Sequence, residues 1–247
     1  MSLQNGFTLL KHEQKKLILE KLKIRKASGY YRQGSFSDEI IWDNRKFLFP
    51  SPKKRIREGM WVFRSVLNDV RDYIENRRIR AKERLPVNLW NANIETTFRG
   101  KVTATDIDHA YWRIAFLEGY IKDKTYKNGL ALKDKSLRLA SLANLSSSKE
   151  YNVIKNGEIT NKTIVLKYDP ILHKIYNNIR YTCYEHMTNI ANMLGSDFIC
   201  YKTDCIYYKD TEKNRILVQT YLDSVALEWK QLIQPEKPKR EEENINI

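Results

Sequence analysis

The clearest hydrophobic pattern lies in residues 52–84, which begin PKKRIREGMWVF and end RRIRAKER. Apolar side chains recur there at steps of three and four, a spacing typical of a helix with one buried face. Pro52 suits the first turn of such a helix. The sequence therefore predicts a long helix, with these residues on its buried face: Ile56, Met60, Phe63, Leu67, Val70 and Ile74.

Similar but weaker periodicity predicts further helices at 9–26, 109–121, 124–145 and about 170–194, the third interrupted near Gly129. Gly195 is a natural residue just past the end of the fourth. Another helix is predicted from about Thr211, with five apolar residues available for packing: Leu217, Tyr221, Leu222, Leu227 and Trp229.

β-branched and aromatic residues predict strands at 101–107, 197–201 and 205–208. Residues 150–168 indicate a β-hairpin, because Asn156-Gly157 is a favoured two-residue turn. Residues 27–51 are expected to be loop-like, since prolines punctuate their only short apolar piece, FLFP. The order of elements predicts an α+β fold, a layer of antiparallel strands covered by helices.

The pattern divides the 247 residues into three parts. Residues 1–100 are expected to form a basic, mainly helical region, and residues 101–233 an α+β domain. Residues 234–247 are charged and lack a core pattern, so a disordered tail is expected.

The chain carries 44 Lys and Arg against 30 Asp and Glu, a formal charge of +14. Such an excess favours a polyanionic partner, because cations displace counterions from phosphates. The predicted helix concentrates the charge, although a solvated helix face is the alternative. Its candidate nucleic-acid contacts are Lys53, Lys54, Arg57, Arg64, Arg71, Arg77, Arg78, Arg80, Lys82 and Arg84.

Three cysteines, an odd number, do not suggest a secreted disulfide framework. The sequence has no signal peptide and no apolar run long enough to cross a bilayer, so a cytoplasmic protein without membrane contact is expected. Cys183, His186, Cys200 and Cys205 are zinc-compatible types without the spacing of a compact finger; buried cysteines are the better interpretation.

Two aspartates stand in strand-like stretches: Asp106 in ATDIDHAYW and Asp204 in YKTDCIYY. The predicted layout can bring both to one sheet edge, where carboxylates suit Mg²⁺ or Mn²⁺ and metal-dependent phosphoryl transfer. Other roles stay open. Asp106, or more readily Asp108, could cap the following helix, and Asp204 could be an ordinary turn residue.

The stretch DIDHAY at 106–111 resembles motif A of family B DNA polymerases, and YKTDCIY at 201–207 resembles their motif C. The resemblance covers about residues 101–230. It implies a palm-like sheet in a shortened, phage-type version. It also implies that Asp106 and Asp204 bind the metal with the carbonyl of Ile107, and that Tyr111 lies under the sugar of an incoming nucleotide.

The sequence departs from the family at several positions. Lys202 replaces the first acid of motif C, and His109, Ala110 and Trp112 replace other motif A residues. Motif B has no clean match; the nearest piece offers Lys135 and Arg138 as triphosphate contacts.

These features support three hypotheses. The first is a minimal nucleotidyltransferase using nucleoside triphosphates on nucleic acid, DNA rather than RNA. The second is a catalytically inactive, palm-derived protein that binds nucleic acid or serves in a virion or in replication. The third is a metal-dependent nuclease. Ser146 to Ser148 have no evident His–Asp partners, so a hydrolase triad is not expected.

Overall fold

The computed structural model describes residues 7–34, 36–77, 79–82 and 101–233. Contacts divide the chain into two compact units, which we call unit 1 (residues 1–81 and 115–178) and unit 2 (residues 82–114 and 179–247). The division differs from the predicted boundary at residue 100, because the hairpin after residue 148 pairs with N-terminal strands.

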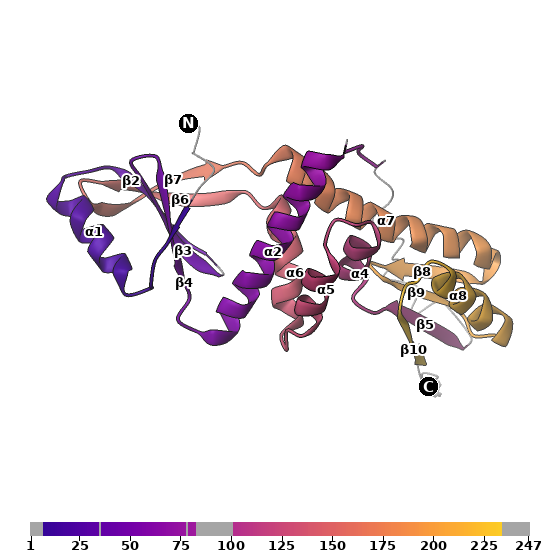
Figure 1. The fold of residues 1–247 in the computed structure, drawn as a ribbon. Coiled ribbons are helices and arrows are strands. Elements are labelled where there is room, and N and C mark those ends of the chain that lie inside the picture. The colour runs from indigo at the N-terminus through magenta and orange to yellow at the C-terminus, as the bar shows by residue number, and fades with distance from the viewer. Residues whose placement is uncertain (1–6, 35, 78, 83–100, 234–247) are drawn as a thin grey trace, which may run out of the picture. The chain divides into compact units, whose positions relative to one another are not determined.

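Unit 1 contains a six-stranded sheet in the order β1-β4-β3-β2-β6-β7 (Figure 1). Only the β1–β4 pair is parallel. The strands are β1 (Phe7–Leu9), β2 (Gly29–Gln33), β3 (Ser37–Trp42), β4 (Arg45–Pro50), β6 (Lys149–Lys155) and β7 (Glu158–Leu166).

The loop predicted at residues 27–51 is wrong, since this stretch contains β2, β3 and β4. Strand β2 pairs on one side with β3 and on the other with β6, where Tyr30 lies opposite Val153. The pairing of β2 with β6 is distant in the sequence, and strand formation depends on such partners more than on local propensity. The β3–β4 hairpin is local, and its turn residues Asp43 and Asn44 both have positive φ, a turn signal that the sequence interpretation missed.

The predicted β6–β7 hairpin is confirmed. Asn156 and Gly157 both have positive φ, 53° and 78°, as a type I′ turn requires.

The helices of unit 1 include the predicted long helix, α2 (Lys54–Asn76), which ends at Asn76 rather than beyond residue 80. Its most buried residues are Gly59, Met60, Val62, Val66 and Val70, so one face is covered as expected. The other helical elements are α1 (Gln14–Ile24), α5 (Asp123–Leu130), α6 (Lys135–Ala143) and a 3₁₀ turn (Asn144–Ser146). The boundary between the units falls within two further helices, α4 (Ala110–Leu117) and α7 (Pro170–Leu194).

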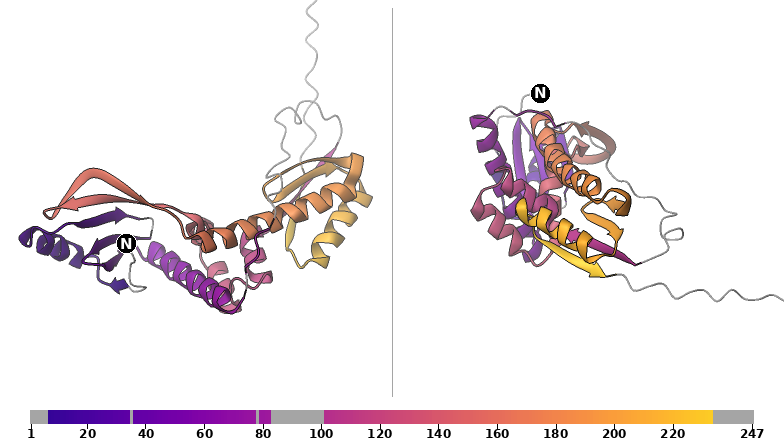
Figure 2. Two further views of the ribbon diagram at one scale, coloured as in Figure 1. Left: turned by 90° about the horizontal axis from the view of Figure 1, so that it is seen from above. Right: turned by 90° about the vertical axis from the view of Figure 1, so that its right-hand side faces the viewer.

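Unit 2 contains a four-stranded antiparallel sheet in the order β10-β5-β9-β8. Its strands are β5 (Val102–Ile107), β8 (Phe198–Lys202), β9 (Cys205–Lys209) and β10 (Trp229–Ile233). Along the chain they alternate with helices as β-α-β-β-α-β, the split βαβ arrangement. The C-terminal part of α7 and α8 (Glu212–Ser224) lie against this sheet (Figures 1 and 2). The predicted α+β fold, an antiparallel sheet covered by helices, is confirmed.

The last predicted helix is too long, because α8 ends at Ser224 and Trp229 begins a strand. Ala226 has a φ of 56°, and the amides of Ala226 and Leu227 donate to the carbonyls of Asp223 and Leu222. This is a Schellman motif, which normally uses glycine at the left-handed position. With alanine there, the stop signal was not visible in the sequence.

Candidate functional site

The structure brings the backbones of the two predicted acids together in unit 2. Strands β5 and β9 are neighbours, and Asp106 lies directly opposite Cys205, the residue after Asp204. The amide of Ile107 donates to the carbonyl oxygen of Asp204 at 3.0 Å. Asp106 is the penultimate residue of β5 and is partly exposed, and Asp204 lies in the two-residue turn between β8 and β9.

A row of polar residues crosses the sheet at this level. Lys230 on β10 pairs with Asp106, Asp106 with Cys205, and Cys205 with Lys202 on β8. Residues directly opposite each other on paired strands point to the same face. Lys202, which stands in place of an acid of motif C, therefore lies on the same face as Asp106.

Lys230 was not predicted as a site residue, and it forms ion pairs with Asp106 and Asp108. Its Nζ atom lies 2.9 Å from Oδ2 of Asp106 and 3.0 Å from Oδ1 of Asp108. The hydrogen bonds to Asp106 and Asp108 and their charges raise the pKa of Lys230, so it stays protonated at neutral pH. Because its segment was predicted to be helical, no sequence signal connected it with Asp106.

The turn that carries Asp204 has an unusual backbone. Thr203 has a φ of 59°, and a β-branched residue is a genuine outlier in that left-handed region. Its carbonyl oxygen lies 3.8 Å from Sγ of Cys183, a buried thiol on α7. Strained residues of this kind cluster at functional sites, where the surrounding structure maintains them.

Burial keeps the neighbouring thiol and phenol groups neutral. It raises the pKa of Cys205 to about 11 and that of Tyr207 to about 12. Cys205 lies between Asp106 and Lys202 in the cross-strand row.

Tyr111 comes after Asp106 in the sequence and lies on α4. Its hydroxyl lies 3.2 Å from that of Tyr184, which also accepts a hydrogen bond from Nη2 of Arg180 at 3.4 Å. Burial, with the hydrogen bond to Tyr184, raises the pKa of Tyr111. The hydroxyl is therefore engaged within unit 2, and the ring is the part left to contact a ligand.

The oxygen donors near Asp106 and Asp204 are of the type that a hard divalent cation prefers, but they are few. Asp106 and Asp204 carry carboxylate oxygens and Ile107 a carbonyl oxygen, and donor atoms of these types suit Mg²⁺ or Mn²⁺. No group of three or more His, Cys, Asp or Glu within the described residues is arranged to bind a metal. An ion bound here would need water or phosphate oxygens to complete its coordination.

The two predicted triphosphate contacts lie in unit 1, not with the acids of unit 2. Arg138 is only 3% exposed, and its Nη1 donates to the carbonyl of Gly129 at 3.1 Å. It joins α6 to the end of α5, a structural role that the sequence interpretation missed. Lys135 is exposed at the first turn of α6.

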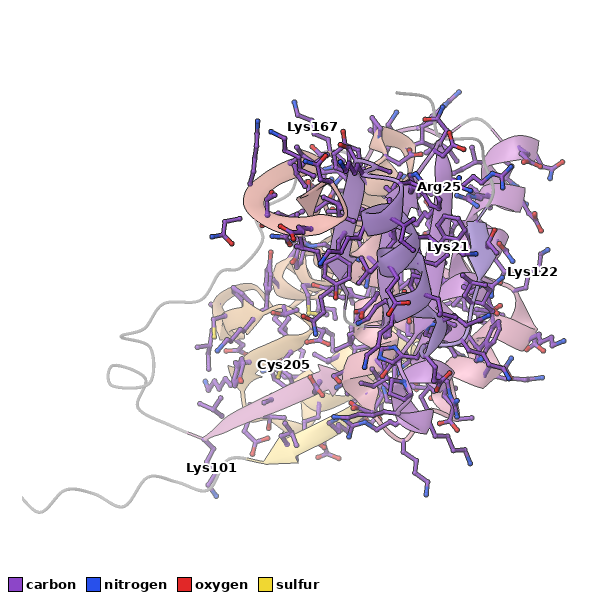
Figure 3. All side chains as sticks on the ribbon, turned by 90° about the vertical axis from the view of Figure 1, so that its left-hand side faces the viewer. Lys21, Arg25, Lys101, Lys122, Lys167 and Cys205 are labelled. Atoms are coloured by element: carbon purple, nitrogen blue, oxygen red, sulfur yellow. The ribbon has the colours of Figure 1, made fainter. Side chains whose placement is uncertain are left out.

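Most of the predicted nucleic-acid contacts are exposed cations: Lys53, Lys54, Arg57, Arg71, Arg77 and Arg80. Arg64 is half-buried against the rings of Phe7 and Trp61, and Lys82 pairs with Glu185 at 3.0 Å. Arg78 and Arg84 lie outside the described residues. Positive charge is not confined to α2, because cations also extend from other elements, among them Lys21, Arg25 and Lys122 (Figure 3).

All three cysteines belong to unit 2. Each is a buried thiol that forms no disulfide, and the burial is as predicted; Cys205 lies on the sheet of unit 2 (Figure 3). Nδ1 of His186 lies 2.9 Å from the Tyr221 hydroxyl.

One serine has a histidine neighbour that the sequence did not reveal. Oγ of Ser146 lies 2.6 Å from Nδ1 of His173, and Nε2 of His173 lies 2.9 Å from Nδ2 of Asn177. An amide nitrogen can only donate, so His173 in this arrangement donates from Nδ1 to Ser146 and cannot act as its base. The contact therefore joins the 3₁₀ turn to α7 and gives no activated nucleophile.

Comparisons with protein-family models, with curated proteins and with solved structures find no match for this chain. No helix within the described ranges combines the length and apolar composition needed to cross a membrane.

Proposed function

We propose that the chain is a nucleotidyltransferase that acts on nucleic acid by metal-dependent phosphoryl transfer, with Asp106 and Asp204 as metal ligands. The observation that carries the proposal is the pairing of β5 with β9, which sets Asp106 opposite Cys205 and next to Asp204. Two segments far apart in the sequence, each resembling a polymerase motif, are thus neighbours at one end of a single sheet.

The split βαβ order of unit 2 adds support, because a palm-like sheet was expected from the resemblance alone. A fold by itself does not establish an activity, so the proposal depends on the acids rather than on the topology.

Each side chain has a role in this proposal. Asp106 and Asp204 bind Mg²⁺ or Mn²⁺, which when bound stabilises charge on the transferred phosphoryl group. The ring of Tyr111 lies under the nucleotide sugar, and the exposed cations of α2 contact the nucleic-acid backbone. Lys230 pairs with both Asp106 and Asp108, so an ion that binds to Asp106 competes with its ammonium group.

The test is extension of a primed DNA template by the purified protein with deoxynucleotides and Mg²⁺ or Mn²⁺. Asp106→Asn and Asp204→Asn are expected to lower the rate on the order of a hundredfold or more, since each removes a metal ligand. Glu212→Gln is the matched control. It removes one exposed acid from α8 of the same unit and should leave the rate unchanged.

Extension that survives both aspartate substitutions would show that the acids are wrongly assigned. The same incubation without nucleotides reports cleavage and so tests the nuclease alternative. Wild-type protein that binds DNA but neither extends nor cleaves it would exclude both enzymatic functions.

A specific observation favours a second candidate, a protein that binds nucleic acid without catalysis. Lys230 occupies the cation position beside Asp106, and Lys202 lies in the same cross-strand row. Paramagnetic resonance of Mn²⁺ separates the candidates. The nucleotidyltransferase requires the wild type to bind Mn²⁺ through Asp106. The binding protein predicts no Mn²⁺ site in the wild type, with one appearing in Lys230→Met.

A further inference from the structure

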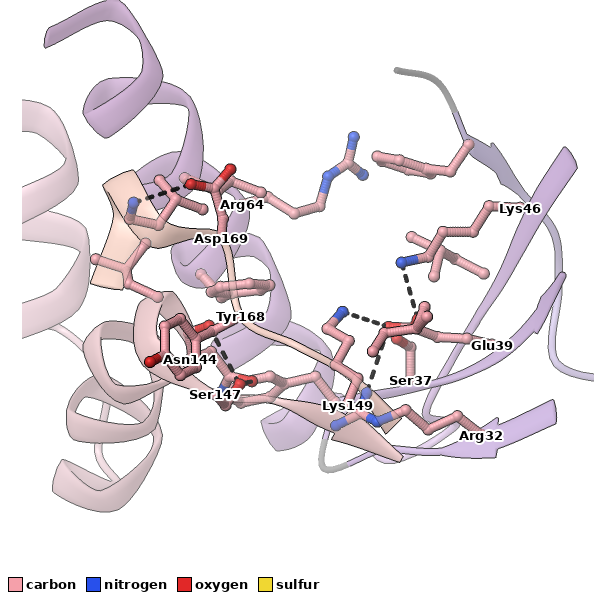
Figure 4. A pocket seen from close by; sticks show the side chains of 18 of the residues that line it. Arg32, Ser37, Glu39, Lys46, Arg64, Asn144, Ser147, Lys149, Tyr168 and Asp169 are labelled. Carbon is pink, nitrogen blue, oxygen red and sulfur yellow. Dashed lines mark hydrogen bonds and ion pairs between the residues drawn. The ribbon is translucent and has the colours of Figure 1, made fainter. Parts of the chain in front are cut away.

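Unit 1 contains a cavity of about 380 Å³ that the proposed catalytic edge does not use. Its lining comes from the six-stranded sheet, from α2 and from the segment that enters α7, all within unit 1. Figure 4 shows Arg64 extending from α2 toward the sheet that carries Lys46 and Glu39. The volume lies within the range of small-molecule sites.

The lining is strongly cationic. Six basic side chains face two acids, Glu39 and Asp169. The basic residues are Arg32, Lys46, Arg64, Arg71, Lys149 and Lys167.

The carboxylate of Glu39 is paired with cations of the lining, and its single negative charge does not balance theirs. This carboxylate, 5% exposed, lies 2.8 Å from Nζ of Lys46, 3.0 Å from Nζ of Lys149 and 3.4 Å from Nη1 of Arg32. One negative charge thus serves three cations. Burial and the charge of Lys46 lower the pKa of Lys149, and Glu39 offsets this only in part.

Asp169 is also committed. Its Oδ1 accepts the amides of Ile171 at 2.8 Å and Leu172 at 3.2 Å, so it caps the first turn of α7. Within the described part of the chain, Arg64, Arg71 and Lys167 have no carboxylate within salt-bridge distance. The excess positive charge of the cavity is therefore concentrated on these three residues.

The other part of the wall is apolar and aromatic. Phe36 and Phe63 are stacked with ring centroids 6.0 Å apart, and the guanidinium of Arg64 lies 4.8 Å from the ring centroid of Phe7. Phe63 and Leu67 were expected in the helix core but face this space instead.

We propose that this cavity binds a nucleoside 5′-phosphate, with its phosphates on the cations and its base against the aromatic wall. Arginine and lysine recognise phosphate oxygens, and aromatic rings stack on bases of any sequence. The site uses no metal and neither aspartate of unit 2, so it stands or falls independently of the proposed catalysis.

The experiment is isothermal titration calorimetry with ATP, tripolyphosphate and adenosine in EDTA, on protein carrying Asp106→Asn. This background removes metal-dependent binding in unit 2. ATP is expected to bind at one site. Tripolyphosphate and adenosine are each expected to bind at least tenfold more weakly, because the first lacks the base and the second lacks the phosphates. Labelling with 8-azido-ATP is expected on peptides that contain Phe7, Phe63 or Tyr168.

Arg64→Gln and Arg71→Gln should each weaken ATP binding on the order of tenfold, because each removes a charge-assisted hydrogen bond to phosphate. Arg71 is exposed, so its replacement does not threaten folding. The matched control is Arg57→Gln, which removes the same charge from an earlier turn of α2 and outside the cavity lining. ATP affinity should not change.

Any of these results would overturn the proposal: no saturable ATP binding at millimolar concentration, full affinity in both arginine variants, or an equally weakened affinity in Arg57→Gln. The last would assign the effect to the outer surface of α2. Tripolyphosphate binding as tightly as ATP would also contradict it, because the aromatic wall would then contribute nothing.

Discussion

Two carboxylates on strands, Asp106 and Glu39, are paired with lysines from neighbouring strands. Asp106 on β5 meets Lys230 of β10, and Glu39 on β3 meets Lys46 of β4 and Lys149 of β6. A buried carboxylate is costly unless it is paired and hydrogen-bonded. Glu39 shows how such pairing changes the pKa of a buried carboxylate.

Burial by itself would raise the pKa of Glu39. The charges of Lys149 and Lys46, with hydrogen bonds from Lys46 and Tyr151, lower it instead to about 2, against 4.5 for the free side chain. The unfolded chain therefore binds a proton at higher pH than the native chain does. The resulting stability, about 3 kcal/mol, is complete above pH 4.5 and is lost as the pH falls toward 2.

Glu39→Gln is expected to remove this contribution. At neutral pH it should lower the free energy of unfolding by a few kcal/mol, because three cations would lose their carboxylate. Between pH 4.5 and 2 its stability should fall less steeply than that of the wild type. Urea denaturation across this range measures both, and equal slopes for the two proteins would contradict the assignment of the low pKa to Glu39.

At the level of elements, the sequence revealed those whose signals are local. The periodicity of α2 and the Asn156-Gly157 turn each depend on neighbouring residues, and both elements form as predicted. Strands β2 and β10 pair with β6 and β5, far along the chain, and both were missed. Strands β3 and β4 were also missed, although they form a hairpin whose two turn residues, Asp43 and Asn44, both have positive φ. The acidic residues Asp38 and Glu39 give the sequence of β3 a polar character. In the structure both are buried, and Asp38 pairs with Lys15 and Glu39 with Lys46.

The residues of the candidate site also differ in whether a local sequence signal identifies them. Asp106 and Asp204 were found because each lies in a short motif with a recognisable context. Lys230 was not, because its contact depends on β10 pairing with β5. The cavity of unit 1 was also invisible, since its cations come from segments that are separate in the sequence.

The β6–β7 turn provides a test at this level. Gly157 has a φ of 78°, and a Cβ atom there would lie 2.2 Å from Cα of Lys23. Gly157→Ala therefore meets both backbone strain and a clash with main chain that cannot move aside. It is expected to cost about 2 kcal/mol or more of stability, measured by urea denaturation.

Gly195→Ala is the matched control, because Gly195 also has a positive φ, 56°, but nothing lies within 4 Å of an added Cβ. It should cost only the backbone term, about 1 kcal/mol. Similar destabilisation in the two variants would mean that the close approach of the turn to Lys23 has no energetic weight.

At the scale of the whole molecule, the net charge of +14 affects nucleic-acid binding differently from individual contacts between a cation and a phosphate. A net charge raises the affinity for nucleic acid at long range, whereas cations that touch phosphates release counterions and set the salt dependence. The exposed cations of α2 belong to the second class in the proposed function. On α1, Lys16, Lys21 and Lys23 are also exposed and have no assigned role.

Two triple variants separate these effects. Lys53→Gln, Lys54→Gln and Arg57→Gln together should flatten the plot of log affinity against log salt concentration by roughly 0.9 for each phosphate of duplex DNA that they leave without a cation. Lys16→Gln, Lys21→Gln and Lys23→Gln on α1 remove the same charge and should leave the slope unchanged. Fluorescence anisotropy across roughly 50 to 200 mM KCl is the measurement. Equal flattening in both variants would mean that net charge, and not a surface on α2, governs binding.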